Sequence, residues 1–149
     1  MEGRGYQIIV VEDSRADFHI IQESLRQSGL NCQITAFSDG AAAILHVTRG
    51  DGQVPDLVIL DLNVPEADGA SVLNAVRGNT RWAHVPVFVF TASLSPADVA
   101  RVKMLGGDRY LIKPMDLAGF EKFGREIREW LEQNALRTHE TSGSSPPGT

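Results

Sequence analysis

The segment VILDLNVP, from Val58 to Pro65, places three apolar residues directly before an aspartate, and a proline follows four residues later. This run predicts a buried strand that ends on the carboxylate of Asp61. A second apolar run, Tyr6–Val11, ends on Glu12 and Asp13 in the same way. A single aspartate after a strand is often only a turn or helix cap. Two such endings instead predict one shared, strongly negative pocket, because ligands of an open parallel sheet bind at the carboxyl ends of its strands.

The negative charge of three carboxylates in one pocket must be reduced or balanced. Either the pKa of one carboxyl group rises until that group is neutral, or a cation binds. Hard oxygen ligands favour Mg²⁺, with Mn²⁺ as the second choice. Because Mg²⁺ usually shares its coordination shell with phosphate oxygens, the pocket indicates phosphoryl chemistry.

The composition restricts the class of protein. A chain of 149 residues with 42% apolar content suits one domain, which buries about two thirds of its unfolded surface. The net charge of -5 argues against a nucleic-acid partner, which needs a basic face. The single Cys32 excludes an internal disulfide and fits a reducing compartment. No signal-peptide pattern is visible, and no apolar segment approaches the ~18 residues of a membrane span. We therefore expect a cytoplasmic protein with no membrane partner.

Five apolar runs alternate with helical segments along the chain. Strands are expected at residues 6–11, 32–37, 57–60, 85–90 and 109–112, and helices at about residues 14–28, 41–48, 70–77, 95–105 and 116–136. This alternation predicts an α/β fold with a doubly wound parallel sheet and helices on both faces. The sequence thus predicts one domain over residues 1–136 with an extended C-terminal helix. Residues 137–149, rich in Ser, Gly and Pro, are expected to form a flexible tail.

Two further strand ends carry polar residues. The fourth strand runs into Thr91-Ala92-Ser93, and the fifth into Lys113-Pro114, with Tyr110 three residues before the lysine. An acidic pair, an aspartate, a threonine and a Lys-Pro pair in this order resemble the receiver domain of bacterial two-component response regulators, over roughly residues 6–131. The resemblance implies a flavodoxin-like fold with strand order 2-1-3-4-5. The opening segment from Val11 to Asp17 resembles stand-alone receivers that accompany phytochrome histidine kinases.

The resemblance also implies the acceptor and its metal. Asp61 would accept a phosphoryl group from a phosphohistidine of a sensor histidine kinase, here of the phytochrome type. Mg²⁺ would be held by Glu12, Asp13, Asp61 and the main-chain carbonyl of Asn63. Such a metal beside an aspartate neutralises the phosphoryl oxygens during in-line attack, which agrees with the physical argument.

The remaining implied roles concern the phosphoryl group and the response to it. Lys113 would pair with Asp61 and then with the phosphoryl oxygens, from a cis Lys113–Pro114 bond. The hydroxyl of Thr91 would bind the phosphoryl group, and Tyr110 would turn into the space that Thr91 leaves. Asn63 and Ser93, each two residues beyond a site residue, would tune the lifetime of the phosphoaspartate.

Three different functions would share part of this pattern. A haloacid-dehalogenase-type phosphatase also forms a phosphoaspartate, but it places a second aspartate two residues after the first. Here that position is Asn63, which cannot act as a general acid or base. A receiver domain can also serve as a phosphate sink, or as an interaction module that is never phosphorylated. The full set of Asp61, Thr91 and Lys113 argues against the unphosphorylated module.

The end of the sequence suggests how a signal would leave the domain. No foldable segment follows Leu136, so we expect the output to be a surface of the domain itself. Helical spacing places Phe120, Phe123 and Ile127 toward the sheet. Trp130 and Leu131 are expected to lie beyond the sheet and to form a homodimer interface.

Overall fold

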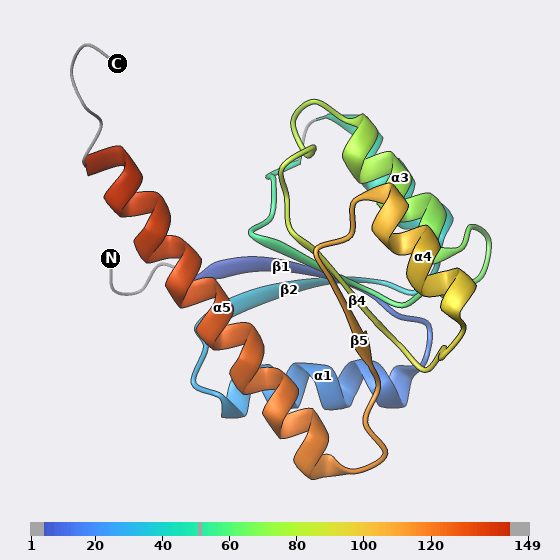
Figure 1. Cartoon of the computed structure of the whole chain (residues 1–149), viewed down its shortest axis with the longest axis horizontal. Helices are drawn as coiled ribbons and strands as arrows, with labels where there is room; N and C mark the ends of the chain where they lie inside the picture. Colours follow the sequence, from blue (N-terminus) through green and yellow to red (C-terminus); the bar gives the residue numbers. More distant parts are fainter. Residues whose placement is uncertain (1–4, 51, 144–149) are drawn as a thin grey trace.

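The computed structural model describes residues 5–50 and 52–143, with side chains described up to residue 135. Strands and helices alternate along the described chain (Figure 1). In order, they are β1 (Tyr6–Val11), α1 (Arg15–Gln27), β2 (Cys32–Phe37), α2 (Gly40–Arg49), β3 (Leu57–Leu60), α3 (Gly69–Gly78), β4 (Val87–Thr91), α4 (Pro96–Leu105), β5 (Arg109–Ile112) and α5 (Leu117–Gly143).

The strands form one parallel sheet in the order β2-β1-β3-β4-β5, which confirms the predicted fold and strand order. Helices α1 and α5 lie on one face, and α2, α3 and α4 lie on the other (Figure 1). Strand β4 differs from its predicted range. It begins at Val87 because Val85 closes a turn by donating its N–H to the carbonyl of Trp82 at 2.9 Å.

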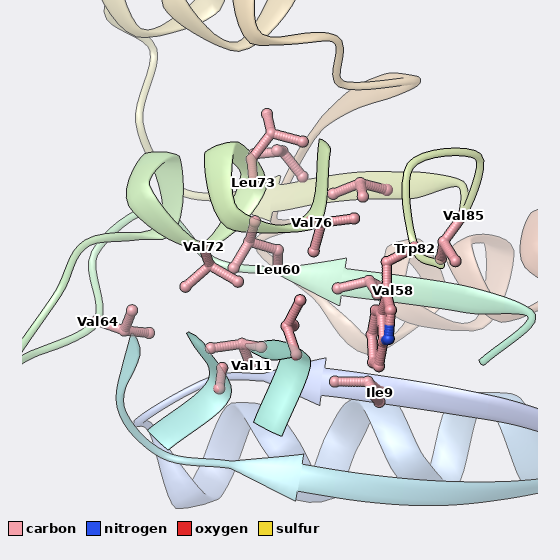
Figure 2. Close-up of a cluster of buried hydrophobic side chains, with 14 of the residues drawn as sticks. Ile9, Val11, Val58, Leu60, Val64, Val72, Leu73, Val76, Trp82 and Val85 are labelled. Atoms are coloured by element: carbon pink, nitrogen blue, oxygen red, sulfur yellow. The ribbon is translucent and has the colours of Figure 1, made fainter. Parts of the chain in front are cut away.

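Two apolar layers hold the helices to the sheet. On one face, α2, α3 and α4 pack on β1, β3 and β4, with Trp82 at the edge (Figure 2). On the other face, Ile21 and Leu25 of α1 and Phe123 and Ile127 of α5 cover the same strands. Every residue of β3 and β4 is buried, since these strands are covered on both faces. The sheet is therefore a rigid platform for the residues that follow its strands.

Helix caps fix where four of the helices begin. Ser14, Asp39, Asp68 and Ser95 each accept a hydrogen bond from a main-chain N–H in the first turn. A cap of this kind contributes about 1 kcal/mol. Each capped helix follows a strand, so the caps hold the helix N-termini at the carboxyl edge of the sheet.

Two glycines let the loop between β3 and α3 lie tightly over this edge. A Cβ atom on Gly40 would collide with the main chain of Ala67, and one on Gly69 would collide with the main chain of Asp61. The N–H of Gly40 donates to Pro65 at 3.0 Å and that of Gly69 to Leu62 at 3.0 Å. The loop thus closes against Asp61 because no side chain separates the chain segments.

The C-terminal helix differs from its prediction in length. It continues to Gly143, beyond the expected end near Leu136, and its last turns project past the sheet (Figure 1). Residues 137–142 contain neither glycine nor proline, so nothing in them breaks a helix. The rest of the predicted tail, residues 144–149, lies outside the described residues.

The prediction that Trp130 and Leu131 lie beyond the sheet was also wrong. Leu131 is 4% exposed and belongs to the core. Trp130 is half-buried, and its ring packs edge-on against Phe88 with 5.0 Å between centroids. Leu30 and Tyr6 belong to the same apolar cluster as Leu131, so the core continues further along α5 than was predicted.

Candidate functional site

Three carboxylates meet where β1 and β3 end. Val11 and Leu60 are register partners, so Glu12 and Asp61 leave the sheet side by side. Glu12, Asp13 and Asp61 each bring one oxygen within 4.8 Å of the others. Glu12 and Asp61 are each 6% exposed, whereas Asp13 is exposed to solvent. The structure therefore brings the predicted acidic residues into one pocket with one open side.

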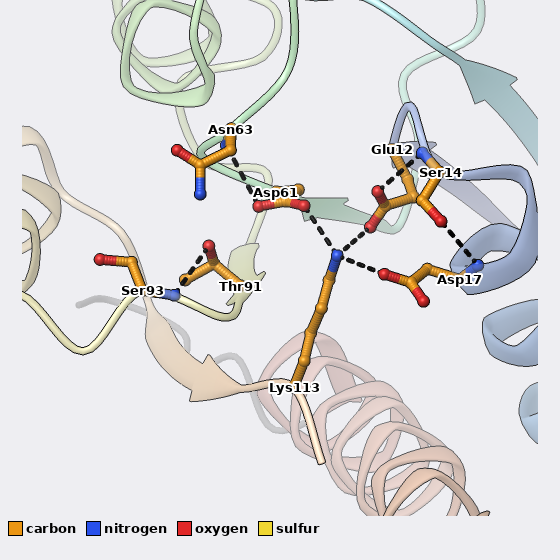
Figure 3. A network of polar contacts seen from close by, with 8 residues as sticks. All are labelled: Glu12, Ser14, Asp17, Asp61, Asn63, Thr91, Ser93 and Lys113. Atoms are coloured by element: carbon orange, nitrogen blue, oxygen red, sulfur yellow. Dashed lines mark hydrogen bonds and ion pairs between the residues drawn. The ribbon is translucent and has the colours of Figure 1, made fainter. Parts of the chain in front are cut away.

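Lys113 reaches into this pocket from the end of β5 (Figure 3). Its Nζ lies 2.8 Å from Glu12 Oε1, 2.8 Å from Asp61 Oδ2 and 2.8 Å from Asp17 Oδ2. An ammonium group has three N–H donors, and here the three can donate to three different carboxylates. The lysine is thus a fixed positive charge beside Asp61.

Both oxygens of Asp61 have defined partners. Oδ2 pairs with Lys113, and Oδ1 accepts a hydrogen bond from the N–H of Asn63 at 3.1 Å. The main-chain N–H of Asp61 donates to the carbonyl of Val11 at 3.0 Å. These contacts hold the carboxylate in one orientation at the strand end.

Burial and charge shift the pKa values of two groups. Burial raises the pKa of Glu12, although the hydrogen bonds from Lys113 and from the N–H of Ser14 act in the opposite direction. Burial alone would lower the pKa of Lys113. The hydrogen bonds to Asp17, Asp61 and Glu12 outweigh that effect, so the pKa of Lys113 lies above its ordinary value. The lysine therefore stays charged over the physiological range of pH.

A second chain of contacts leads from the pocket to α4. Thr91 is fully buried at the end of β4, and its Oγ1 accepts the N–H of Ser93 at 3.4 Å. The Ser93 hydroxyl donates a hydrogen bond to Asp98, in the first turn of α4, at 2.5 Å. The main-chain carbonyl of Ser93 accepts a hydrogen bond from the Tyr110 hydroxyl at 3.0 Å. Ser93 therefore joins the residue at the pocket, the first turn of α4 and the aromatic residue of β5.

Some expectations for the site need correction. The Lys113–Pro114 bond is trans, because no cis peptide bond occurs at any described residue. The side chain still points inward, and the Lys113 N–H donates to the carbonyl of Thr91 at 2.8 Å. Trp130, which was predicted at an interface and not at the pocket, packs on Phe88, near the start of β4.

Sequence reasoning missed two residues that contact the site. Asp17 pairs with Lys113, and Asp98 pairs with Ser93. Both are acidic residues in the first turn of a helix that follows a site strand. That position was the available signal, but it is also where acidic residues commonly occur for helix stability alone.

The donor set fits a hard divalent cation. Two buried carboxylates and one exposed carboxylate supply oxygen ligands that face each other, and the exposed one leaves room for water. The members of this cluster are all carboxylates, with no nitrogen or sulfur donor among the described residues that compose it. The site is therefore suited to Mg²⁺ or Mn²⁺.

Comparison with known proteins agrees with this geometry. Residues 8–123 match the family model described as the response regulator receiver domain. The chain is 34% identical to the response regulator Rcp1 of Synechocystis over 134 residues, which cover 87% of this chain and 91% of Rcp1. The Mn²⁺-bound structure of Rcp1 superposes with a TM-score of 0.78, at 33% identity over 85% of this chain and 95% of that one.

Two other solved structures extend the comparison. The phosphorylated cyanobacterial phytochrome response regulator RcpA has a TM-score of 0.81 at 27% identity, covering 88% of this chain and 96% of that one. The receiver domain of the sensor histidine kinase PA1611 from Pseudomonas aeruginosa, solved with magnesium in its active-site cleft, has a TM-score of 0.69 at 26% identity, covering 87% and 99%. The family match, the fold and the placement of the acidic cluster lead to one conclusion: the chain belongs to the response regulator receiver domain family.

Proposed function

We propose that this response regulator receiver domain accepts a phosphoryl group on Asp61 from a sensor histidine kinase. The observation that carries the proposal is the state of Asp61. It is a buried carboxylate within 4.8 Å of two other acidic groups and is held by Lys113 at 2.8 Å. Such an arrangement suits a nucleophile whose product carries additional negative charge.

The proposed step transfers one phosphoryl group. An oxygen of Asp61 forms a bond to phosphorus while the bond from phosphorus to the histidine nitrogen breaks, and the nitrogen keeps the electron pair. When bound, Mg²⁺ supplies positive charge to the phosphoryl oxygens, with Glu12, Asp13, Asp61 and the carbonyl of Asn63 as its ligands. Lys113 supplies a second positive charge to the same oxygens.

The neighbouring residues stabilise the phosphorylated state and change position when it forms. The hydroxyl of Thr91 donates to the phosphoryl group, and Asn63 and Ser93 set access to the attacking water. Asn63 cannot act as an acid or base, which favours slow loss of phosphate over phosphatase turnover. A shift of Thr91 moves Ser93 and Tyr110 with it, because the three are hydrogen-bonded in series. This connection converts a local charge into a changed surface at α4 and β5.

The kinase partner is proposed from similarity. RcpA was solved as a phytochrome response regulator in phosphorylated form. This similarity supports a histidine kinase of the phytochrome type as the phosphoryl donor. Within the part of the chain that the structure describes, no helix is both long and apolar enough to cross a membrane. We propose a place in the cytoplasm, beside such a kinase.

We also propose a homodimer that uses the edge formed by β5 and α5. Trp130 lines a surface hollow of about 220 Å³ at this edge, together with Phe88, Arg109, Leu111, Glu126, Glu129 and Gln133. A half-buried tryptophan with an arginine beside it is typical of interface cores. Leu131 is buried in the monomer and takes no part in this revised interface.

The proposed function is tested by following the phosphoryl group. The protein is mixed with histidine kinases that carry a labelled phosphohistidine, and the label is followed over time. We expect transfer to this chain with a matched loss from one kinase. Passage of the label to a phosphotransfer protein would identify a shuttle, and loss to water without any downstream partner would identify a phosphate sink. A chain that takes label from none of the kinases and from no small phosphodonor would contradict the proposal.

A further inference from the structure

The strongest unexplained contact in the site belongs to Asp17. This residue lies in the first turn of α1, and its N–H donates to the capping hydroxyl of Ser14 at 3.1 Å. Its Oδ2 accepts a hydrogen bond from the Lys113 ammonium at 2.8 Å (Figure 3). Asp17 is not one of the three carboxylates that face the metal position. Its side chain therefore contacts the site through the lysine.

The three carboxylates that bind Lys113 have different roles in the proposed reaction. Glu12 and Asp61 belong to the acidic cluster that fits a cation, and Asp61 also changes from a carboxylate to an acyl phosphate. Both must share or exchange the lysine during the reaction. Asp17 has neither task. It is therefore the one carboxylate among these three that can keep the ammonium group in place throughout.

We propose that Asp17 is a positioning residue that holds Lys113 at the phosphoryl position while Glu12 and Asp61 change partners. This inference rests on the proposed function. The Lys113 side chain is 12% exposed and that of Asp17 is 31% exposed, so the pair closes the side of the pocket next to α1. Without Asp17, a flexible lysine side chain with two anchors has more orientations, and fewer of them place the charge beside the entering phosphoryl group.

The test uses acetyl phosphate with Mg²⁺, which removes any effect of kinase docking on α1. The Asp61 oxygen bonds to phosphorus as the bond from phosphorus to the acetyl oxygen breaks, and acetate leaves with the electron pair. We expect Asp17→Asn to lower the maximal rate of phosphorylation about fivefold, because the amide oxygen that replaces the carboxylate binds the Lys113 ammonium more weakly. The donor concentration at half-maximal rate should stay unchanged, because Asp17 does not contact the donor.

Three variants separate positioning from a general effect of charge. Glu23→Gln removes the same charge from the same helix, at a site that pairs with Arg26 and not with Lys113, and it should behave as wild type. Asp17→Glu keeps the carboxylate and should recover part of the rate. In a Lys113→Ala background, Asp17→Asn should have no further effect, since Asp17 acts through the lysine.

A second measurement does not need phosphorylation. In urea denaturation of the metal-free chain, the effects of Asp17→Asn and Lys113→Ala on stability should be non-additive, because the two side chains are in contact. Additive effects there, or an unchanged or faster phosphorylation of Asp17→Asn in a chain whose wild type is labelled, would overturn this inference alone. A wild type that takes up no phosphate would overturn both the inference and the proposed function.

Discussion

At the residue scale, the site is an acidic cluster with one fixed cation at its centre. Glu12, Asp17 and Asp61 surround the Lys113 ammonium at equal distances, and Asp13 faces solvent. Four carboxylates against one lysine leave an excess of negative charge, which a divalent cation would offset. The cluster is therefore suited to binding a cation, and its excess negative charge lowers the stability of the fold when no metal is bound.

The pKa of Glu12 gives this imbalance a measurable consequence. Folding raises its pKa above the ordinary value of 4.5, chiefly through burial. The stability that Glu12 contributes is therefore full below about pH 4.5 and is lost as the pH rises through the raised pKa. We expect Glu12→Gln, which keeps an acceptor oxygen for Lys113, to be more stable than wild type at pH 7 without metal. The difference should shrink as the pH falls to about 4.

Chemical denaturation across this pH range measures the effect. Glu121→Gln, at an exposed position of α5, is the matched control and should leave stability close to that of wild type. With Mg²⁺ present, the advantage of Glu12→Gln should fall, since the variant has lost a charged ligand. A wild type that is more stable than Glu12→Gln at pH 7 without metal would contradict the expected cost of the buried charge.

The residues of the site were predictable to different degrees. Asp61, Glu12, Thr91 and Lys113 each lie at the end of an apolar run, so strand ends alone locate them. Asp17 lies on a helix with no periodic signal of its own, and its partner is 96 residues away in sequence. Only the register of the strands and the start of α1 bring the two together. Sequence patterns indicate which edge a residue occupies, but not which side chains meet there.

At the scale of the element, the helix starts matter because they set the edge of the site. Asp68 caps α3, and its Oδ1 accepts both the N–H and the hydroxyl of Ser71 at 2.9 Å. The Ser71 N–H is the main cause of the lowered pKa of Asp68. We expect Asp68→Ala to lower the free energy of unfolding by about 1 kcal/mol at pH 7, as for other helix N-caps.

The same variant has a pH signature of opposite sign to that of Glu12. Because the pKa of Asp68 is lowered below 3.8, its contribution is present above that pH and is lost as the pH falls through the lowered pKa. Denaturation at several pH values measures it. Asp68→Asn, which keeps a capping oxygen, should be within a few tenths of a kcal/mol of wild type at about pH 7. Equal stability of wild type and Asp68→Ala at that pH would show that the cap is not needed.

Elements were predicted better than their ends. The apolar runs identify all five strands, because β3 and β4 are buried on both faces and β1, β2 and β5 carry β-branched or aromatic residues. The end of α5 was misplaced because residues 137–142 lack periodic apolar residues, although they also lack helix breakers. Leu131 was misplaced because it belongs to a cluster that also includes Leu30, in a loop, and Tyr6, at the start of β1, which periodicity within α5 cannot reveal.

At the scale of the whole molecule, the surface at β5 and α5 is where a second copy is proposed to bind. Trp130 is half-buried there and lines the hollow beside Arg109 and Glu129. Truncation of an interface tryptophan commonly costs about 2 kcal/mol or more of binding. We expect Trp130→Ala to raise the dimer dissociation constant by roughly thirtyfold, at about 1.4 kcal/mol per factor of ten.

Sedimentation at several concentrations checks this expectation. Leu45→Ala, at a 59% exposed apolar position on α2, is the matched control and should dimerise as wild type does. Because Trp130 also packs on Phe88, Arg109→Glu offers a second variant that leaves that contact in place. A wild type that remains monomeric in both its phosphorylated and unphosphorylated forms would contradict the dimer. An unchanged dimer in both interface variants would show that the interface lies on another surface.

Asp61 is proposed as the phosphoryl acceptor, and replacing that one carboxylate tests the proposal most directly. Wild type and Asp61→Asn are incubated with acetyl phosphate and Mg²⁺, and their intact masses are measured before and after treatment with hydroxylamine, which cleaves acyl phosphates. We predict that wild type gains the mass of one phosphoryl group and loses it to hydroxylamine. Asp61→Asn should gain nothing while unfolding as cooperatively as wild type. A folded Asp61→Asn chain that still acquires one hydroxylamine-sensitive phosphoryl group would show that the acceptor lies elsewhere.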